Sequence, residues 1–359
     1  MEETTPGGRR PTMADVAKRV GVSRALVSLV FRNQPGAGEE TRRRVLEAAD
    51  ELGYRPDSAA RLLARGRSRT IGVMLTLHQP FEADLVEGVY PEAERLGYDV
   101  LLSASAPGRD ESKAVEALLS HRCEALILLG STASIARLDE LGRRSAVVVI
   151  GRTARGANVD SVHTAEGKGV RQVVNHLVEL GHRHIAHIDG GKEPGAAERR
   201  RAYRAAMRRH QLTEEIRVVP GAHNEDAGIA AGRLFLSEER LPTAVFAGND
   251  RCAMGLLHTL GRAGIDVPGE VSVVGFDDSH LSHLSHIDLS TVRQDAVRMA
   301  EHAVRFVVER LDDSTLDPRE AVLDPKLVVR GTSAAPPSAT GSAGPDDCRC
   351  SPRGHRAGH

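Results

Sequence analysis

The sequence has little cysteine and lacks long apolar runs. Its 359 residues include four cysteines, of which Cys123 and Cys252 lie inside apolar stretches. This usage implies no disulfide framework and is typical of a reducing compartment, so we expect both residues in the core. No segment approaches the roughly 20 apolar residues of a membrane helix, and the first residues lack the basic-then-apolar layout of a secretory signal. We therefore expect a cytoplasmic protein without membrane contact.

Motifs for catalysis are also missing. The chain has no Gly-x-Gly-x-x-Gly after a strand, no Walker loop, no Gly-x-Ser-x-Gly elbow and no His-Glu-x-x-His, so we expect no enzyme and no cofactor. His280, His283 and His286 recur at every third position, which leaves a metal site as the alternative to a polar surface loop. Cys348 and Cys350, with two nearby histidines, leave the same alternative open. We expect no metal at either place, because no neighbouring cysteine completes a site with the three histidines and a tail without structure rarely preorganises ligands.

The net charge of −1 conceals an uneven distribution. Residues 1–69 hold 14 Lys and Arg against 9 Asp and Glu, a balance of +5, so the other 290 residues carry −6. A basic N-terminal part indicates a unit that binds a polyanion, joined to a larger unit with a different function. Chance clustering is the alternative, and the motifs decide between the two.

A chain of 359 residues exceeds the usual size of one domain, and its pattern changes along its length. Between residues 71 and 331, short β-branched runs alternate with longer amphipathic stretches, which predicts α/β structure. Predicted strands are 71–77, 100–104, 125–129, 146–150, 185–189, 217–219, 244–247 and 271–276, and predicted helices are 82–96, 111–121, 134–143, 167–180, 198–210, 226–235, 251–262 and 296–311. So long a pattern predicts two doubly wound lobes facing a cleft.

The front segment predicts consecutive helices without strands. Thr12 can cap a helix that begins at Met13, with Asp15 in the capping-box position, and Ser23 can cap a second helix after the break at Gly21. A helix, a glycine turn and a second helix form the helix-turn-helix layout, which apolar Val16, Val22 and Val27 and the small Ala17 would pack together. A third helix is predicted over roughly 40–52 and a last short one over 58–65.

These residues resemble the lactose-repressor (LacI/GalR) family of transcription regulators. The matching segments in the front part are 12–17, 21–23, 27–28, 41–42, 52–56 and 59–63. Further matches, in family order, are 71–73, 80–81, 181–186, 249–250, 274–278, 291–294 and 327–332. The resemblance therefore extends from about residue 12 to residue 332, and it implies a helix-turn-helix head followed by a periplasmic-binding-protein-like domain of two lobes.

The resemblance implies which residues of the head contact DNA. Arg24 and Ala25, at the start of the second helix, would face base edges in the major groove, where Arg24 can donate to guanine or, alternatively, contact only phosphate. Leu29 replaces the usual arginine and would contact a thymine methyl or simply pack. The positions that donate to phosphate in the family are Thr12, Ser23, Ser28, Thr41 and Tyr54, with capping or packing as the alternative for Ser28 and Thr41.

The segment 58–65 is too short for a stable isolated helix. In the family, two such segments fold against each other in the minor groove and insert a leucine, which here is Leu63; Ala60 lies in the same segment. Asp57 replaces the usual asparagine and adds negative charge near phosphate. The alternative is an ordinary linker.

The resemblance also implies an effector site. Phe81, Arg199, Asn249 and Asp277 would line the cleft and bind a small metabolite, commonly a sugar. An inter-lobe salt bridge is the alternative for Arg199 and Asp277, and Asp278 is expected to cap or orient backbone. Glu82 replaces a second aromatic residue and would favour a cationic or amino-bearing effector.

The sequence thus predicts a homodimeric regulator, most simply a repressor, that binds a pseudo-palindromic operator in duplex DNA in the cytoplasm at the nucleoid. Co-repressor-dependent or activating regulation is the alternative, followed by a solute-binding protein without gene control. Residues 333–359 contain no leucine, so the family's tetramerising tail is not matched. The expected parts are an arm without structure (1–11), the head (12–56), a hinge (57–69), the two-lobe domain (70–332, with lobes of about 70–163 plus 293–323 and 164–291 plus 326–332) and a tail without structure (333–359).

Overall fold

The computed structural model describes residues 11–31, 34–55 and 67–337, which fall into two units that divide after Ser68. The described residues of the N-terminal unit form the helices α1 (Met13–Val20), α2 (Arg24–Phe31) and α3 (Glu39–Glu51). The Asp15 carboxylate accepts hydrogen bonds from the backbone N–H (2.8 Å) and the hydroxyl (2.6 Å) of Thr12, as the capping pattern predicted. Gly21 ends α1 with φ = 77°, a conformation that glycine adopts without strain.

A small apolar core holds the three helices together. Val16, Val27 and Val45, one from each helix, are fully buried, and Val22 packs against them from the turn. The predicted helix-turn-helix packing is therefore confirmed. The predicted short helix at 58–65 lies outside the described residues.

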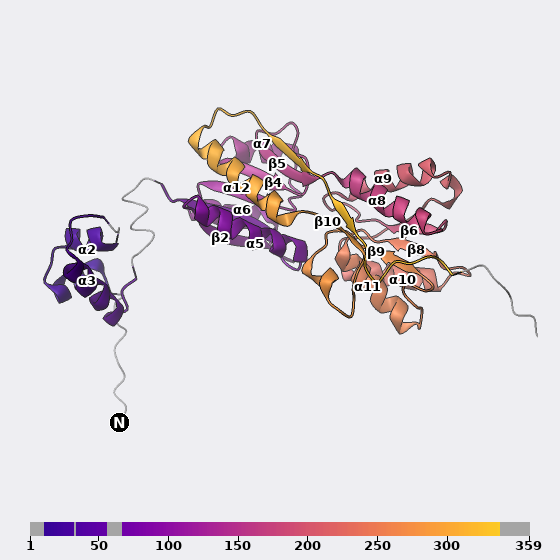
Figure 1. Ribbon diagram of the computed structural model, residues 1–359. Helices are drawn as coiled ribbons and strands as arrows, with labels where there is room; N and C mark the ends of the chain where they lie inside the picture. The colour runs from indigo at the N-terminus through magenta and orange to yellow at the C-terminus, as the bar shows by residue number, and fades with distance from the viewer. Residues whose placement is uncertain (1–10, 32–33, 56–66, 338–359) are drawn as a thin grey trace, which may run out of the picture. The chain divides into compact units, whose positions relative to one another are not determined.

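Lobe I of the C-terminal unit is built on a six-stranded parallel sheet of order β11-β5-β4-β3-β1-β2. Its strands are β1 (Thr70–Thr76), β2 (Asp99–Ser105), β3 (Ala125–Leu129), β4 (Ala146–Ile150), β5 (Asp160–Thr164) and β11 (Glu320–Leu323). One face is covered by α5 (Pro80–Arg95) and α12 (Ala296–Asp312), which lie side by side, and the other by α6 (Glu111–Ser120) and α7 (Ile135–Gly142) (Figure 1). Because helices cover both faces, β3 and β4 are buried throughout.

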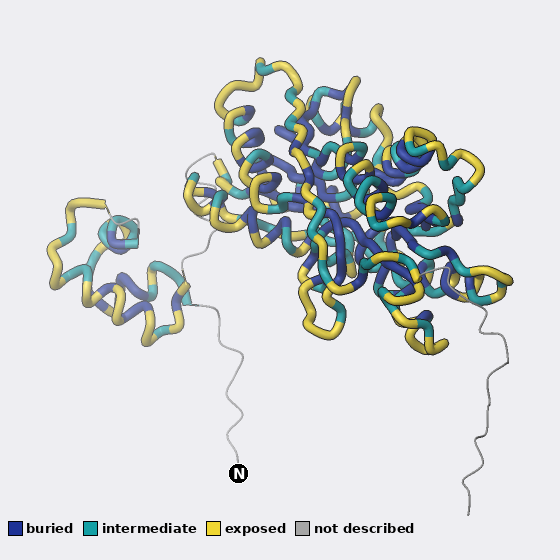
Figure 2. Tube along the Cα trace, turned by 45° about the vertical axis from the view of Figure 1, so that its right-hand side comes forward, coloured by how far each residue is buried: buried dark blue, intermediate teal, exposed yellow. Residues whose placement is uncertain are grey.

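Lobe II contains a four-stranded parallel sheet of order β7-β6-β8-β9. The strands are β6 (Ile185–Ile188), β7 (Arg217–Val219), β8 (Ala244–Phe246) and β9 (Ser272–Val274). Its helices are α8 (Glu166–Glu179), α9 (Ala196–Arg209), α10 (Glu225–Leu236) and α11 (Asp250–Arg262), with short 3-10 turns η1 (Thr213–Glu215) and η2 (His280–His283). Buried residues concentrate in the interior of the unit (Figure 2). The parallel sheets with helices packed on both faces confirm the predicted doubly wound lobes.

The chain crosses between the lobes three times. It leaves lobe I between β5 and α8, returns along β10 (Thr291–Arg293), and crosses again along β12 (Lys326–Val328), which pairs antiparallel with β10. Each lobe is therefore assembled from separate stretches of chain, and the two antiparallel strands form a short ribbon between the lobes (Figure 1).

Most predicted elements are confirmed within a few residues, and 125–129 and 146–150 match β3 and β4 at both ends. Four strands were not predicted, namely β5, β10, β11 and β12. The expected tail begins too early: Ser333 contacts His176 (3.1 Å), and the carbonyl of Ala334 accepts from Ser272 (3.0 Å), so the ordered fold continues past residue 332. Cys123 and Cys252 are buried as expected, and none of the helices in the described ranges is long and apolar enough to span a membrane.

Candidate functional site

A cavity of about 130 Å³ lies between the two lobes. Lobe I contributes Thr76, Gln79, Phe81, Glu82, Leu85, Gly130, Ile150 and Gly151 to its wall. The second lobe and the crossing segments contribute Glu166, Glu193, Pro194, Arg199, His223, Asn249, Asp277 and Gln294. Most of the polar residues follow strands β6, β8 and β9 or begin helices, because open parallel sheets present their carboxyl ends to a ligand.

All four residues predicted for the effector site line this cavity. Phe81 lies in the first turn of α5, and Arg199 lies in the first turn of α9. Asn249 caps α11, since its side-chain oxygen accepts from the N–H of Cys252 (3.0 Å). Asp277 follows β9 with φ = 125°, and its carboxylate accepts from the Gln294 amide (2.8 Å). The fold thus gathers residues that are nearly 200 positions apart in the sequence.

Arg199 is the central cation of the site, and its partners lie in lobe II. Its Nε lies 2.7 Å from a Glu166 oxygen, and its Nη1 donates to the carbonyl of Gly248 (2.6 Å). The guanidinium lies 3.7 Å from the centre of the Phe276 ring. Burial opposes the charge, but Glu166 and Asp277 raise the pKa of Arg199 above its ordinary value. Arg199 pairs with Glu166 at 2.7 Å and lies 3.9 Å from Asp277. Because all three residues belong to lobe II, these ion pairs do not join the lobes, and the alternative of an inter-lobe salt bridge is wrong.

Two aspartates behind Arg199 are buried acids. Burial raises the pKa of Asp277 well above its ordinary value, although Arg199 acts in the opposite direction. Burial raises the pKa of Asp250 to about 7, against the hydrogen bonds from Thr291 and Ser279. Burial thus favours the protonated form of both aspartates.

Glu82 supplies another buried carboxyl from lobe I. It is 8% exposed, and its Oε2 accepts from the N–H of Thr76 at 2.5 Å. A Cβ at Gly130 would overlap Oε1 of Glu82, so the carboxyl fits only beside a glycine. Burial raises the pKa of Glu82 to about 8, and the charges of Glu193 and Glu111 act in the same direction. The sequence had marked this position as unusual, and the structure adds that burial favours the protonated form of its carboxyl group.

His223 is a wall residue that sequence reasoning missed. It is 9% exposed, and its Nε2 has no hydrogen-bond partner within the described part of the chain. Burial, followed by the nearby charge of Arg199, lowers the pKa of His223 well below its ordinary value, so the ring is neutral. A single histidine in the loop before α10 carries no pattern that a sequence could reveal. Glu193 was missed for the same reason.

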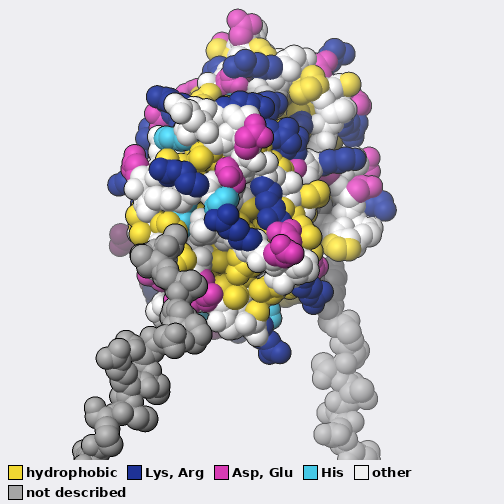
Figure 3. All heavy atoms as spheres, turned by 90° about the vertical axis from the view of Figure 1, so that its right-hand side faces the viewer, with side chains coloured by type: hydrophobic (Ala, Val, Ile, Leu, Met, Phe, Trp, Pro, Cys, Tyr) yellow, Lys and Arg dark blue, Asp and Glu magenta, His cyan; other side chains and the backbone are white. Residues whose placement is uncertain are grey.

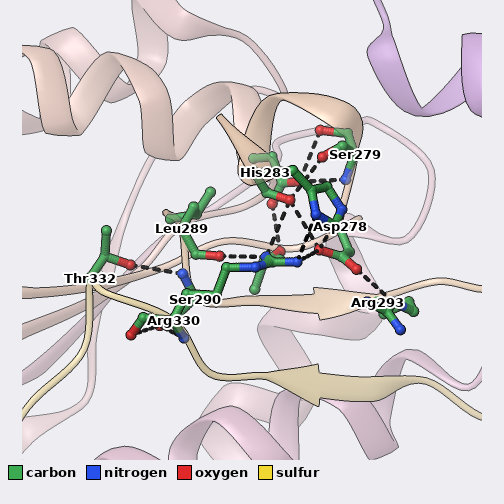
Figure 4. A network of polar contacts seen from close by, with 11 residues as sticks. Asp278, Ser279, His283, Leu289, Ser290, Arg293, Arg330 and Thr332 are labelled. Carbon is green, nitrogen blue, oxygen red and sulfur yellow. Dashed lines mark hydrogen bonds and ion pairs between the residues drawn. The ribbon is translucent and has the colours of Figure 1, made fainter. Parts of the chain in front are cut away.

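Asp278 has a different role from the expected backbone cap. Its carboxylate pairs with Arg293 at the end of β10 (2.6 Å) and with Arg330 beyond β12 (2.6 Å). His283 approaches the same carboxylate at 3.4 Å (Figure 4). Burial would raise the pKa of Asp278, but Arg293 and Arg330 hold it below its ordinary value. Asp278 therefore anchors both crossing strands to lobe II.

Two polar contacts join the lobes beside the cavity. His280 on η2 lies 3.7 Å from Asp84 on α5, and the Gln79 amide lies 3.5 Å from the carbonyl of His223. Both contacts would change if the lobes moved relative to each other.

In the N-terminal unit, Arg24 and Ala25 are exposed at the start of α2. Arg24 makes no hydrogen bond or ion pair with another described residue, so its guanidinium is available to a ligand. Ser23 accepts from the N–H of Leu26 (3.2 Å), as a helix cap does. The structure thus leaves the first turn of α2 open to solvent.

The other predicted DNA contacts are less exposed. Ser28, Leu29 and Thr41 are half-buried, and the Thr12 hydroxyl bonds to Asp15. Tyr54 is 7% exposed and packs edge-on against Phe31 with ring centres 5.5 Å apart. Ala60 and Leu63 lie outside the described residues.

Surface charge on the C-terminal unit is mixed. The end of lobe II that faces the viewer in Figure 3 carries basic and acidic side chains intermixed rather than separated by sign. This face lacks the single-sign character that favours a polyanion.

Two family models match the chain. "Bacterial regulatory proteins, lacI family" matches residues 12–57, and "Periplasmic binding protein-like domain" matches residues 174–333. Catabolite control protein A from Priestia megaterium is 30% identical over 312 residues, which are 85% of this chain and 94% of that protein.

Solved structures give the same picture. A LacI transcriptional regulator from a Rhodococcus species is 44% identical with a TM-score of 0.73, and the match covers 75% of this chain and 100% of that one. The lac repressor dimer bound to operator and the anti-inducer ONPF is 26% identical with a TM-score of 0.77, and the match covers 91% of this chain and 100% of that one. The chain has a helix-turn-helix unit and two doubly wound lobes, and it is 30% identical to catabolite control protein A over 94% of that protein. The chain therefore belongs to the LacI family of bacterial regulatory proteins.

Proposed function

We propose that the protein is a homodimeric transcriptional repressor whose affinity for operator DNA is controlled by a small metabolite in the inter-lobe cavity. One observation carries the proposal: the same chain presents an unpaired Arg24 at the start of α2 and gathers Phe81, Arg199, Asn249 and Asp277 around a cavity. The first feature suits reading of DNA, and the second suits binding of a polar ligand.

On DNA, the first residues of α2 enter the major groove. Arg24 donates to guanine O6 and N7, Ala25 contacts a neighbouring base edge, and Leu29 meets a thymine methyl. Thr12, Ser23, Ser28, Thr41 and Tyr54 bond to phosphates and fix the register without reading sequence. The hinge residues Ala60 and Leu63 lie in the minor groove, where Leu63 opens the central base step. The lac repressor, solved on its operator as a dimer, supports this arrangement.

In the cavity, the ligand is a hydroxylated metabolite of the sugar class. Asn249, Asp277 and Arg199 offer donors and acceptors for neighbouring hydroxyl groups, and Phe81 offers an apolar ring. The relative CelR, which is 29% identical with a TM-score of 0.65 and matched over 90% of this chain and 100% of its own, was solved with cellobiose.

Control of DNA binding follows from the position of the cavity. A ligand that contacts both lobes favours one lobe arrangement by the difference in its affinity for the two arrangements. The inter-lobe contacts of Asp84 with His280 and of Gln79 with His223 are the ones that such a change remakes. In a dimer, lobe movement changes the separation of the two hinge segments and so their folding on DNA.

The proposal is tested by selecting duplexes from a random pool with the full chain at fixed salt. We expect an enriched pseudo-palindrome, weaker binding by Leu63→Ala, and a steep loss of affinity with salt. Leu46→Ala is the matched control, because Leu46 is an exposed leucine on α3. A monomer at micromolar concentration, or a chain that enriches no sequence, contradicts the proposal. A reporter gene behind the selected site then distinguishes repression from activation.

A further inference from the structure

The titratable groups on the cavity wall are strongly unbalanced. Four carboxyl groups line it (Glu82, Glu166, Glu193 and Asp277), against a single guanidinium, Arg199. Arg199 is already committed to Glu166 at 2.7 Å and to the Gly248 carbonyl at 2.6 Å. The described wall therefore offers no uncommitted cation to a phosphate or carboxylate group of a ligand, while it offers several oxygens to a donor.

The part of the wall nearest lobe I combines an aromatic ring with carboxyl groups. Phe81 and Glu82 are neighbours in the first turn of α5, and Glu193 faces the same cavity from lobe II. Glu82 and Glu193 are close enough for the charge of Glu193 to raise the pKa of Glu82, and Glu111 on α6 acts likewise. Burial also raises the pKa of Glu193. A ligand cation beside these two carboxyl groups would relieve their mutual repulsion.

The histidine on the cavity wall adds no charge to it. The ring of His223 is buried and neutral, and its Nε2 has no partner among the described residues, although a buried ring nitrogen ordinarily has one. This nitrogen is enclosed beside the backbone of Gly190, so the ring of His223 gives the ligand a neutral surface and no hydrogen-bonding atom.

We propose that the effector is a hydroxylated small molecule that carries a protonated amino group, which binds between Glu82 and Glu193 beside the ring of Phe81. This inference rests on the proposed function, since it assigns the chemistry of the same cavity. The ammonium group donates to both carboxylates and lies against an aromatic face, and the hydroxyl groups bond to Asn249 and Asp277. Phosphorylated sugars are excluded, because they would bring negative charge to a wall that is already acidic.

The test uses matched ligands on the full chain. Glucose, galactose and mannose are each compared with their 2-amino-2-deoxy and 6-phosphate derivatives by calorimetry. We expect at least one amino sugar to bind about tenfold more tightly than its neutral parent, a difference of about 1.4 kcal/mol, and no phosphate to bind. Glu82→Gln and Glu193→Gln should each abolish most of this preference. Glu94→Gln, an exposed glutamate on the same helix, should leave it unchanged.

Three results overturn the inference: a neutral sugar that binds as tightly as its amino derivative, a phosphate that binds more tightly, or no binding by any member of the panel. Glutamine retains the shape of a protonated Glu82, so loss of folding does not obscure the comparison. Binding to the selected duplex is measured in parallel. A chain that binds the duplex but prefers neutral sugars defeats this inference alone, whereas amino-sugar binding without duplex binding defeats the proposed function.

Discussion

The adjacent residues Asp277 and Asp278 direct their carboxylates to two different parts of the C-terminal unit. Asp277 lines the cavity and accepts from Gln294, whereas Asp278 holds Arg293 and Arg330 on the two crossing strands. Both residues have positive φ angles, 125° and 56°, which non-glycine residues adopt at a cost of order 1–3 kcal/mol. Asp277 and Asp278 thus connect the wall of the cavity directly to the strands that cross between the lobes.

We expect Asp278→Asn to destabilise the C-terminal unit by about 3–5 kcal/mol, because it leaves Arg330, which is largely buried, without its carboxylate. Urea unfolding measures the loss. The pKa of Asp278 is lowered, so its stabilisation is complete above the ordinary aspartate range and disappears as the pH falls through the lowered pKa. Asp226→Asn, on the exposed side of α10, should change stability by less than about 0.5 kcal/mol.

Glu82 should make the stability of the unliganded protein depend on pH in the opposite direction. Its folded-state pKa of about 8 exceeds the ordinary value of 4.5, so its contribution is complete below pH 4.5 and is lost as the pH rises towards 8. The loss amounts to at most about 1.4 kcal/mol per pH unit. Glu82→Gln removes this term, so the variant should gain stability relative to the wild type between pH 5 and 8, as measured by unfolding at each pH. A constant difference across that range would show that folding does not raise the pKa of Glu82.

Asn249 has two roles that substitution can separate. Asn249→Ala should cost about 0.5–2 kcal/mol of stability, because it removes the cap of α11. Asn249→Ser should restore most of that stability, since serine also caps helices. Both variants should weaken effector binding, because neither carries the amide. Unfolding and calorimetry together report the separation, and full effector affinity in the serine variant would assign Asn249 to capping alone.

Arg24→Ala should lower operator affinity by about 1–3 kcal/mol and relax the preference at one base pair of each half-site. Thr41→Ala, which removes a predicted phosphate contact, should weaken binding to all duplexes alike. Binding to a set of single-base operator variants at constant salt distinguishes the two effects. If Arg24→Ala weakens every duplex equally, Arg24 contacts phosphate only.

The fold was largely predictable, because short stretches of sequence carry the signals for most helices and strands. The run Val147 to Ile150 has the continuous apolar character of a strand covered on both faces, and Thr12 with Asp15 marks a helix start. Strand β5 was missed because it begins with Asp160, a residue type that is typical of loops. Asp160 is nevertheless fully buried, because Arg310 (2.7 Å) and Arg319 (2.9 Å) neutralise it from positions 150 and 159 residues away.

The cavity was predictable only where the family motifs reach it. Arg199, Asn249 and Asp277 follow from those motifs, whereas His223 and Glu193 sit in loops without a local pattern. The protonation of Glu82 depends on the burial that two lobes and Gly130 create together, which no stretch of sequence encodes alone.

Synthesis from the N-terminus gives the last described residues a particular importance. Strand β11 (Glu320–Leu323) forms an edge of the lobe I sheet, and the carbonyl of Thr332 accepts from Val273 beside the lobe II sheet at 2.7 Å. Until these residues have left the ribosome, the lobe I sheet lacks its edge strand and the lobe II sheet lacks its bond to Thr332, so the C-terminal unit completes its folding late in synthesis. The three helices of the N-terminal unit draw on residues 12–54 and can pack much earlier. A message truncated near codon 315 would therefore yield a folded N-terminal unit attached to an incomplete C-terminal unit.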